Sequence, residues 1–327
     1  MTSNSMKTIE ISEFGGPDVL VPGTRDVPDC GETEVLIKIT AAGVNGPDIV
    51  QRRGHYPPPP GASDLLGLEV SGEVVETGKN VKKWAVGDRI CALTNGGGYA
   101  EYVAVESGHC LPIPQGVEER DAAGLPETLF TVWNNVFLNQ TIPAGALMLV
   151  HGGAGGIGST AIQLGKAFRL RVFATSGKPE GCKFCEEMGA ERAINYREED
   201  FVEIVKEAGG ADIIVDIIGG DYIARNISAA KPDGRIIQLA FNKGSKVEVN
   251  LMPIMLKRLT YTGSTLRPRS KAFKAEIAAD LLAKVWPLFA EGKIKTHTHA
   301  TFPFDQVVDA HKMMEQAAHR GKILLTP

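Results

Sequence analysis

A glycine-rich stretch near the middle of the chain is the clearest candidate for binding a ligand. Residues 150–158 read Val-His-Gly-Gly-Ala-Gly-Gly-Ile-Gly, so Gly153, Gly155 and Gly158 have GxGxxG spacing. An apolar run over 147–150 precedes them, and helical spacing of apolar residues follows over 157–168. A strand, a glycine turn and a helix N-terminus in this order present backbone N–H groups to a pyrophosphate. We therefore expect a dinucleotide to bind at Gly153, Ala154, Gly155, Gly156, Ile157 and Gly158; the alternative is a glycine turn without a ligand.

The end of the next predicted strand indicates which dinucleotide would bind. An NAD site usually has an acidic residue about 20 residues after the loop, where it binds the ribose 2′-hydroxyl. Here residues 174–179 read Ala-Thr-Ser-Gly-Lys-Pro, and the first acid is Glu180. Ser176, with Thr175 beside it, offers a donor, and Lys178 offers a positive charge that suits a 2′-phosphate. The pattern favours NADPH, although Lys178 also fits a solvated surface lysine.

Two patterns of secondary structure divide the chain. Up to about residue 120, short β-branched runs with frequent turns suggest a small barrel or sandwich. From Ala146 onward, apolar strands alternate with helical segments, which implies a parallel sheet with right-handed crossovers. A long amphipathic helix is expected over 271–291, and the tail from Ile294 should end in a strand over 322–325.

Composition and charge exclude several classes of protein. The 327 residues carry a formal net charge of −4 and no basic, aromatic-rich stripe, so we expect no binding to nucleic acid or to a membrane. No apolar run reaches the ~18–20 residues that span a bilayer. The polar start of the chain does not resemble a secretory signal, so a cytoplasmic location is expected. Five scattered cysteines argue against a disulfide framework, and the Cys182/Cys185 pair is expected to be incidental.

Ordered motifs along the whole chain resemble one known family. They include Ala42-Gly-Val-Asn-Gly-Pro-Asp48, Leu66-Gly-Leu-Glu-Val-Ser-Gly-Glu73, Val86-Gly-Asp-Arg89, Leu125-Pro-Glu-Thr-Leu-Phe-Thr-Val-Trp133 and Gly321-Lys-Ile-Leu-Leu325. With the glycine loop, these motifs resemble the zinc-independent quinone oxidoreductases, the zeta-crystallin-like branch of the medium-chain dehydrogenase/reductase superfamily.

This resemblance implies an α/β fold of two domains. A GroES-like, β-rich catalytic domain would span residues 1–123 and 268–327. A Rossmann domain, with a doubly wound parallel sheet that binds NADPH, would span residues 124–267. The family places its active site in the cleft between such domains, a common place for ligands.

The resemblance also indicates that the chain binds no zinc. Asn45 and Leu68 stand where zinc-dependent relatives have a cysteine and a histidine, and neither side chain can replace a thiolate or an imidazole as a ligand. The four-cysteine lobe of those relatives would fall between residues 89 and 99, which hold only Cys91. The remaining candidate histidines, His109, His297 and His299, are expected to be surface or packing residues. No metal site is therefore expected.

Several further site residues follow from the resemblance. Asn45 matches an asparagine near the nicotinamide, and Tyr56 matches a cleft tyrosine whose phenol could hydrogen-bond the acceptor or donate a proton. A turn asparagine and a tyrosine packed on prolines are the alternatives. Thr131 and Tyr196 match residues that approach the nicotinamide amide and the adenosine phosphate, and Phe241 and Asn242 follow a strand along which the nicotinamide half should pass. Asp48, Arg52 and Arg267 are additional candidates, and Lys178 would replace a lysine that the family often has at Gly181.

The expected activity is transfer of a hydride from NADPH to a quinone, without a metal and without an evident strong acid–base pair. NADPH-dependent reduction of an enone, alkenal or enoyl thioester would use the same residues. A non-catalytic NADPH-binding protein is a further alternative. The last strand of the parallel sheet, over 259–263, should be an exposed edge, so we expect two copies to pair there in a homodimer or a higher homo-oligomer.

Overall fold

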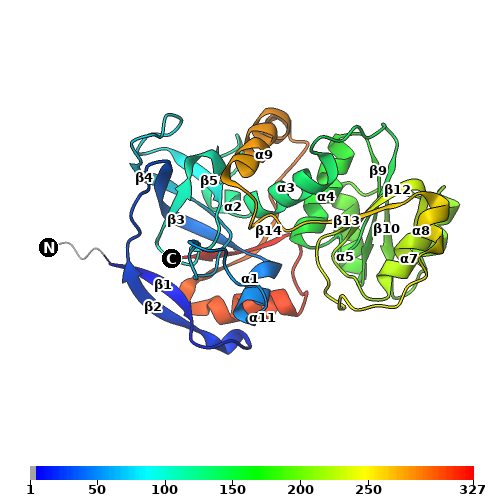
Figure 1. Ribbon diagram of the computed structural model, residues 1–327, viewed down its shortest axis with the longest axis horizontal. Helices are drawn as coiled ribbons and strands as arrows, with labels where there is room; N and C mark the ends of the chain where they lie inside the picture. The colour runs from blue at the N-terminus through cyan, green and yellow to red at the C-terminus, as the bar shows by residue number, and fades with distance from the viewer. Residues whose placement is uncertain (1–4) are drawn as a thin grey trace. The chain divides into compact units, whose positions relative to one another are not determined.

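The computed structural model describes residues 5–327, which form two compact units. The first unit comprises the described residues up to Phe130 together with Arg267–Pro327, and the second comprises Thr131–Leu266. In Figure 1 the first unit therefore takes both ends of the colour range, and the second takes the green and yellow middle. The domain boundaries after residues 123 and 267 stay a prediction. Within residues 5–327, no helix combines the length and the apolar character that crossing a membrane requires.

The first unit is built mainly from strands. Its larger sheet has the order β14-β15-β3-β4-β5-β7, and β6 also pairs with β3. A separate antiparallel pair is formed by β1 and β2. Residues that are β-branched, such as Val35, Ile37 and Ile39 of β3, are buried in its core. The strands are β1 Ser5–Ile11, β2 Leu20–Asp26, β3 Glu34–Val44, β4 Glu69–Thr77, β5 Arg89–Leu93, β6 Tyr102–Glu106, β7 Cys110–Pro112, β14 Thr298–Pro303 and β15 Lys322–Thr326.

Short helices complete the first unit. They are α1 Gly46–Arg52, α2 Glu119–Ala122, α9 Lys271–Lys284, α10 Trp286–Ala290 and α11 Val307–Glu315, while α3 Pro126–Val132 begins in this unit and ends in the second. The single long helix predicted over 271–291 is wrong in one respect, because it is interrupted at Val285 and α10 starts anew with Pro287 in its first turn. Proline lacks the N–H that a continuous helix would need there, but it is tolerated in a first turn.

The second unit has a parallel sheet with the strand order β10-β9-β8-β11-β12-β13. Every pairing in this sheet is parallel, so helices must connect the strands. Helix α4 contacts α5, while α6 contacts α7, which contacts α8. The elements are β8 Leu147–Val150, α4 Gly156–Ala167, β9 Arg171–Ser176, α5 Pro179–Met188, β10 Arg192–Asn195, α6 Phe201–Glu207, β11 Ala211–Asp216, α7 Tyr222–Ala229, β12 Ala230–Gln238, α8 Met252–Lys257 and β13 Thr260–Gly263.

The direction in which this sheet grows reverses beside β8. Strands β9 and β10 lie on one side of β8, and β11, β12 and β13 lie on the other. The reversal creates the switch point at which doubly wound sheets bind ligands, outside the carboxyl ends of their strands. The predicted fold class, a β-rich domain plus a doubly wound parallel sheet, is confirmed.

Candidate functional site

The glycine loop runs from the end of β8 into α4, at the switch point of the sheet. Gly152 has a φ of 67°, the left-handed region that favours glycine. A Cβ on Gly153 would lie 2.7 Å from Cys185 Sγ, and one on Gly158 would overlap the Gly152 carbonyl oxygen. At Gly155 the only neighbour within 4 Å is the Gly152 carbonyl oxygen, at 3.6 Å. Packing therefore requires the first and last glycines of the motif, whereas Gly155 keeps the backbone bare at the N-terminus of α4.

A buried chain of hydrogen bonds inside the second unit holds this loop in position. Asn226 Nδ2 donates to Asp216 Oδ2 (2.9 Å), so its Oδ1 accepts from His151 Nε2 (2.7 Å). The other ring nitrogen of His151 then accepts from Thr175 Oγ1 (3.0 Å), and Gly153 N donates to the Thr175 carbonyl (2.9 Å). Burial lowers the pKa of His151 to about 4, which keeps the ring neutral. The Thr175 hydroxyl is thus used inside the unit, where it supports the loop.

The carboxyl ends of β9 and β10 bring three predicted residues together. Ser176 is the last residue of β9, and its carbonyl accepts from Tyr196 N (3.1 Å) just after β10. Lys178 is exposed at the start of α5, and its ammonium has no hydrogen-bond partner within residues 5–327. A Cβ on Gly177 would overlap the Tyr196 hydroxyl, and one on Gly181 would overlap Ser176 Oγ. Because Gly181 has no side chain, it leaves room for the hydroxyl group of Ser176.

The other predicted cofactor residues lie on two separate segments of the second unit. Phe241 and Asn242 are exposed after β12, where Asn242 N donates to the Ile217 carbonyl (3.3 Å) of the segment after β11. They lie at the same edge of the sheet as the glycine loop, because the carboxyl ends of parallel strands share one edge. Thr131 lies on α3, where its carbonyl accepts from Asn135 Nδ2 (2.8 Å). Among the described residues, no hydrogen bond links Thr131 to the glycine loop.

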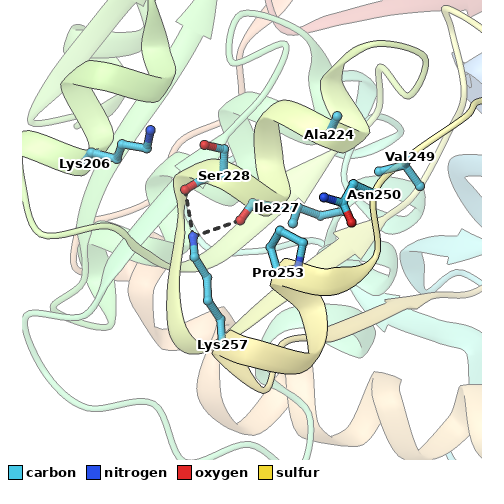
Figure 2. Close-up of a pocket in the computed structure, with 8 residues that line it drawn as sticks. All are labelled: Lys206, Ala224, Ile227, Ser228, Val249, Asn250, Pro253 and Lys257. Atoms are coloured by element: carbon cyan, nitrogen blue, oxygen red, sulfur yellow. Dashed lines mark hydrogen bonds between the residues drawn. The ribbon is translucent and has the colours of Figure 1, made fainter.

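A pocket of about 380 Å³ in the second unit is separate from the glycine loop. Figure 2 shows it between residues of α6, α7 and α8, with Lys257 pointing at the end of α7. Lys257 Nζ donates to the carbonyls of Ile227 (3.0 Å), Ser228 (2.9 Å) and Ala230 (2.7 Å). An ammonium has three N–H donors, so all of them are used at this helix end. The pocket therefore offers no free charge from Lys257 to an anionic ligand.

In the first unit, Asn45 is part of a buried polar cluster. Its Nδ2 donates to Glu69 Oε1 (2.9 Å) and to the Gly43 carbonyl (3.3 Å), and its Oδ1 accepts from Lys322 Nζ (2.6 Å). Lys322 also forms an ion pair with Glu69 (2.6 Å). The side chain of Glu69 is fully buried, and that of Lys322 is 11% exposed. Asn45 thus holds an ammonium and a carboxylate in fixed positions.

A second chain of hydrogen bonds ends on Asp48, the third residue of α1. Arg52 has only donors, so its Nη1 donates to His311 Nδ1 (3.0 Å), and His311 Nε2 then donates to Tyr99 Oη (3.1 Å). Tyr99 in turn donates to Asp48 (3.4 Å). Asp48 and Arg52 are 1% and 0% exposed, so these two candidates lie inside the unit and not on the wall of an open pocket.

Asp48 has the acceptor role in this part of the cluster. Its oxygens accept from Asn45 N (2.8 Å) and Gly67 N (3.0 Å) as well as from Tyr99. Burial raises its pKa to about 6, and the backbone donors oppose the rise. These contacts fix the start of α1, and with it the backbone of Asn45.

Tyr56 and Arg267 contact each other in the first unit. The guanidinium carbon of Arg267 lies 5.4 Å from the centre of the Tyr56 ring, within the range of a cation–π contact. Arg267 is held in place because Nη1 donates to Gln51 Oε1 (2.6 Å) and Nε donates to the Asn95 carbonyl (3.0 Å). The Tyr56 phenol has no hydrogen-bond partner within residues 5–327, and its pKa is raised by burial first and by the charge of Glu127 second.

Glu127 is a member of this cluster that sequence reasoning missed. It is the second residue of α3, and its backbone N donates to Glu69 Oε2 (2.8 Å). No described residue donates a hydrogen bond to its carboxyl group. Burial and then the charge of Glu69 raise its pKa to about 8, while Lys322 and Arg267 oppose the rise. At neutral pH this carboxyl group keeps its proton.

The residues at the positions of zinc ligands do not fit a zinc ion. Asn45 uses its amide to bind Glu69 and Lys322, and Leu68 is an apolar residue with 3% exposure. The ammonium of Lys322 already supplies the positive charge that faces Glu69. His109 is buried and bonds the Lys271 carbonyl (3.1 Å). Within residues 5–327, no three His, Cys, Asp or Glu side chains gather as a possible metal site.

Family models match both units of the chain. A model described as the alcohol dehydrogenase GroES-like domain matches residues 31–115, and one described as zinc-binding dehydrogenase matches residues 188–325. The second description names a metal that the residues at positions 45 and 68 do not fit.

Full-length relatives agree with these matches. Quinone oxidoreductase of Lama guanicoe is 30% identical over 326 residues, which cover 98% of this chain and 97% of the relative. Quinone oxidoreductase of Homo sapiens is 29% identical with the same coverage. The crystal structure of Escherichia coli quinone oxidoreductase complexed with NADPH superposes with a TM-score of 0.87 at 27% identity, and covers 98% of this chain and 100% of that one.

Proposed function

Because the chain belongs to the zinc-independent quinone oxidoreductases of the medium-chain dehydrogenase/reductase superfamily, we propose that it transfers a hydride from NADPH to a quinone. The glycine loop at the switch point is the observation that carries the proposal. Its missing side chains let the loop turn and pack, and Gly155 leaves bare backbone where a pyrophosphate would approach the N-terminus of α4. The likeness to a relative solved with NADPH supports the same cofactor.

Residues at the carboxyl edge of the parallel sheet would hold the two halves of NADPH. The loop residues Gly153 to Gly158 would bind the pyrophosphate. Ser176, Lys178 and Tyr196 would bind the 2′-phosphate side, where Lys178 offers an unpaired positive charge and no acid opposes it. Thr131, Phe241 and Asn242 are proposed for the nicotinamide half. Thr175 acts through His151 and the loop backbone, because its hydroxyl is already bonded.

The first unit would supply the groups that act on the acceptor. The reduced nicotinamide, when bound, provides the hydride. Tyr56 has a phenol without a partner in the described structure, and it would donate a hydrogen bond to the acceptor oxygen as negative charge develops there. Asn45 does not offer a free amide; it positions Lys322 and Glu69 beside this site. A quinone suits such residues, since it accepts a hydride without activation by a metal.

The proposal is tested by NADPH oxidation with purified protein across 1,2-quinones, 1,4-quinones and 2-alkenals, with NADH as the control for the cofactor. We expect turnover of quinones with NADPH in preference to NADH. Turnover of alkenals alone would replace the quinone with an enone as substrate. NADPH binding without turnover of any acceptor would favour a non-catalytic binding protein.

The variant Tyr56→Phe tests the acceptor site. Loss of one hydrogen bond to a developing oxyanion should lower kcat by about 10²–10³-fold, while NADPH affinity measured by fluorescence stays the same. Tyr102→Phe is the matched control, because Tyr102 is a partly buried tyrosine of the same unit on β6. Equal rates for Tyr56→Phe and the wild type would remove Tyr56 from the reaction.

A further inference from the structure

Reduction of a quinone to a hydroquinone consumes one hydride and one proton. The hydride brings both electrons, so the proton must come from the protein or from water. The sequence offered no evident acid for this step, but the folded first unit contains a carboxyl group that is free to provide it. The group is Glu127, which lies in the cluster with Tyr56, Arg267 and Lys322.

The backbone of Glu127 is fixed, whereas its carboxyl group is not. Glu69 Oε2 accepts from Glu127 N at 2.8 Å, and Pro126 begins the helix at the preceding position. The carboxyl oxygens have no hydrogen-bond partner among the described residues. Neither oxygen belongs to the few side-chain atoms that are both fully buried and unpartnered, so both are accessible. They therefore keep contact with solvent, and a ligand could reach them. The other carboxylates of the cluster, Glu69 and Asp48, are both engaged by donors.

The charges around Glu127 keep it protonated without isolating it. Burial is the largest cause of its raised pKa of about 8, and the negative charges of Glu69 and Asp48 add to it. Lys322 and Arg267 pull in the opposite direction, so the pKa stays near neutrality. Two more groups feel the charge of Glu127, namely the Tyr56 phenol and the Lys274 ammonium. An acid works best when its pKa lies near the working pH, because it then both holds and releases its proton.

We propose that Glu127 is the general acid of the reaction and donates a proton to an oxygen of the acceptor as the hydride arrives. The O–H bond of the Glu127 carboxyl breaks, an O–H bond forms on the acceptor, and the carboxylate left behind takes up a proton from water. Tyr56 holds the acceptor oxygen by a hydrogen bond during this transfer. The assignment rests on the proposed quinone reduction.

The test is the pH dependence of kcat in Glu127→Gln, which keeps the shape of the side chain and removes the proton. For the wild type we expect kcat to be level at low pH and to fall as the pH rises through about 8. For Glu127→Gln we expect a rate about 10²-fold lower at pH 7, with no such fall and with unchanged NADPH affinity. Glu127→Asp keeps an acid and should keep the fall in rate at high pH. Glu118→Gln is the matched control, an exposed glutamate of the same unit.

The possible outcomes distinguish the role of Glu127 as general acid from the proposed quinone reduction. A Glu127→Gln enzyme with the rate and the pH profile of the wild type would overturn the role of Glu127 and leave quinone reduction intact. If wild-type protein did not oxidise NADPH with any of the quinones tested, both proposals would be overturned. A rate loss in Glu127→Gln that came with weaker NADPH binding, and with the high-pH fall retained, would make Glu127 a structural residue only.

Discussion

Two carboxyl groups of the first unit differ in how many donors they meet. Asp48 accepts from two backbone N–H groups and from Tyr99, and its pKa is raised only to about 6. Glu127 accepts from no described residue, and its pKa is raised to about 8. Hydrogen bonds to a carboxylate stabilise the charged form, so their number separates the two roles. Asp48 is suited to hold α1, and Glu127 is suited to carry a proton.

The protonation of Glu127 also predicts a dependence of stability on pH. Its pKa is about 8 in the folded protein and 4.5 in an unperturbed chain, so the folded state binds the extra proton between these values. The stabilisation is present in full below pH 4.5 and is lost as the pH rises through about 8. Glu127→Gln lacks this loss. The free energy of unfolding of the variant minus that of the wild type should increase by about 4 kcal/mol between pH 5 and pH 9.

Urea unfolding at a series of pH values measures this difference directly. Other titrating groups affect both proteins equally and cancel in the subtraction. A difference that does not change with pH would mean that Glu127 ionises at its ordinary pKa.

At the residue scale, the sequence predicts candidate cofactor residues but gives no sign of the acid that we propose. Ser176, Lys178 and Tyr196 could be placed near one another because they follow two strands of a repeating pattern. Glu127 could not, because its role depends on Glu69 from β4 and Lys322 from β15, distant parts of the chain. The absence of a partner for a side chain is a property of the folded structure and leaves no pattern in the sequence.

At the scale of elements, the connection between β8 and α4 predicts different results for two glycines. A methyl group on Gly158 would overlap the Gly152 carbonyl oxygen, so Gly158→Ala should destabilise the second unit by about 2 kcal/mol or more. A methyl group on Gly155 meets nothing closer than 3.6 Å. Gly155→Ala should therefore leave the melting temperature unchanged and still weaken NADPH binding, because the methyl group keeps the pyrophosphate from the backbone.

Thermal unfolding and calorimetric titration with NADPH separate the two effects. Gly16→Ala serves as the control, since a Cβ there meets no atom within 4 Å. Unimpaired NADPH binding by a stable Gly155→Ala protein would place the pyrophosphate elsewhere.

The elements themselves could be predicted where their pattern was regular. The alternation that begins at β8 was recognised because parallel strands buried on both faces are continuous apolar runs. The hairpin of β1 and β2 was not recognised, since β2 contains Pro22 and Gly23, which argue against a strand. The short helices α7 and α8 were also missed. Long regular segments carry their own signal, whereas short ones form because the surrounding core stabilises them.

At the scale of the whole molecule, β13 predicts self-association. It is the last strand of the parallel sheet, and all four of its residues are exposed. An unpaired edge presents free N–H and C=O groups that a second copy can satisfy around a two-fold axis. We expect a homodimer joined along β13. Thr262→Asp, which brings two negative charges close across such an axis, should shift the protein to a monomer without weakening NADPH binding.

Light scattering of the wild type and of Thr262→Asp gives the answer. Thr301→Asp is the control, because it places the same charge on an exposed strand position of the first unit. A wild-type protein that is monomeric at all concentrations would contradict the predicted dimer.

The division of the first unit into two stretches of sequence bears on how the protein is made. The second unit is continuous, so it has everything needed to fold while the ribosome is still synthesising the C-terminal stretch of the first unit. The β-rich sheet can be completed only after the end of the chain is made, because β3 pairs with β15. The Asn45 amide oxygen likewise accepts its hydrogen bond from Lys322, a residue of β15. During translation, the nucleotide-binding half can therefore be complete while the half that carries Glu127 is still open. A nascent chain whose residues up to 266 have left the ribosome would bind NADPH before it could reduce anything.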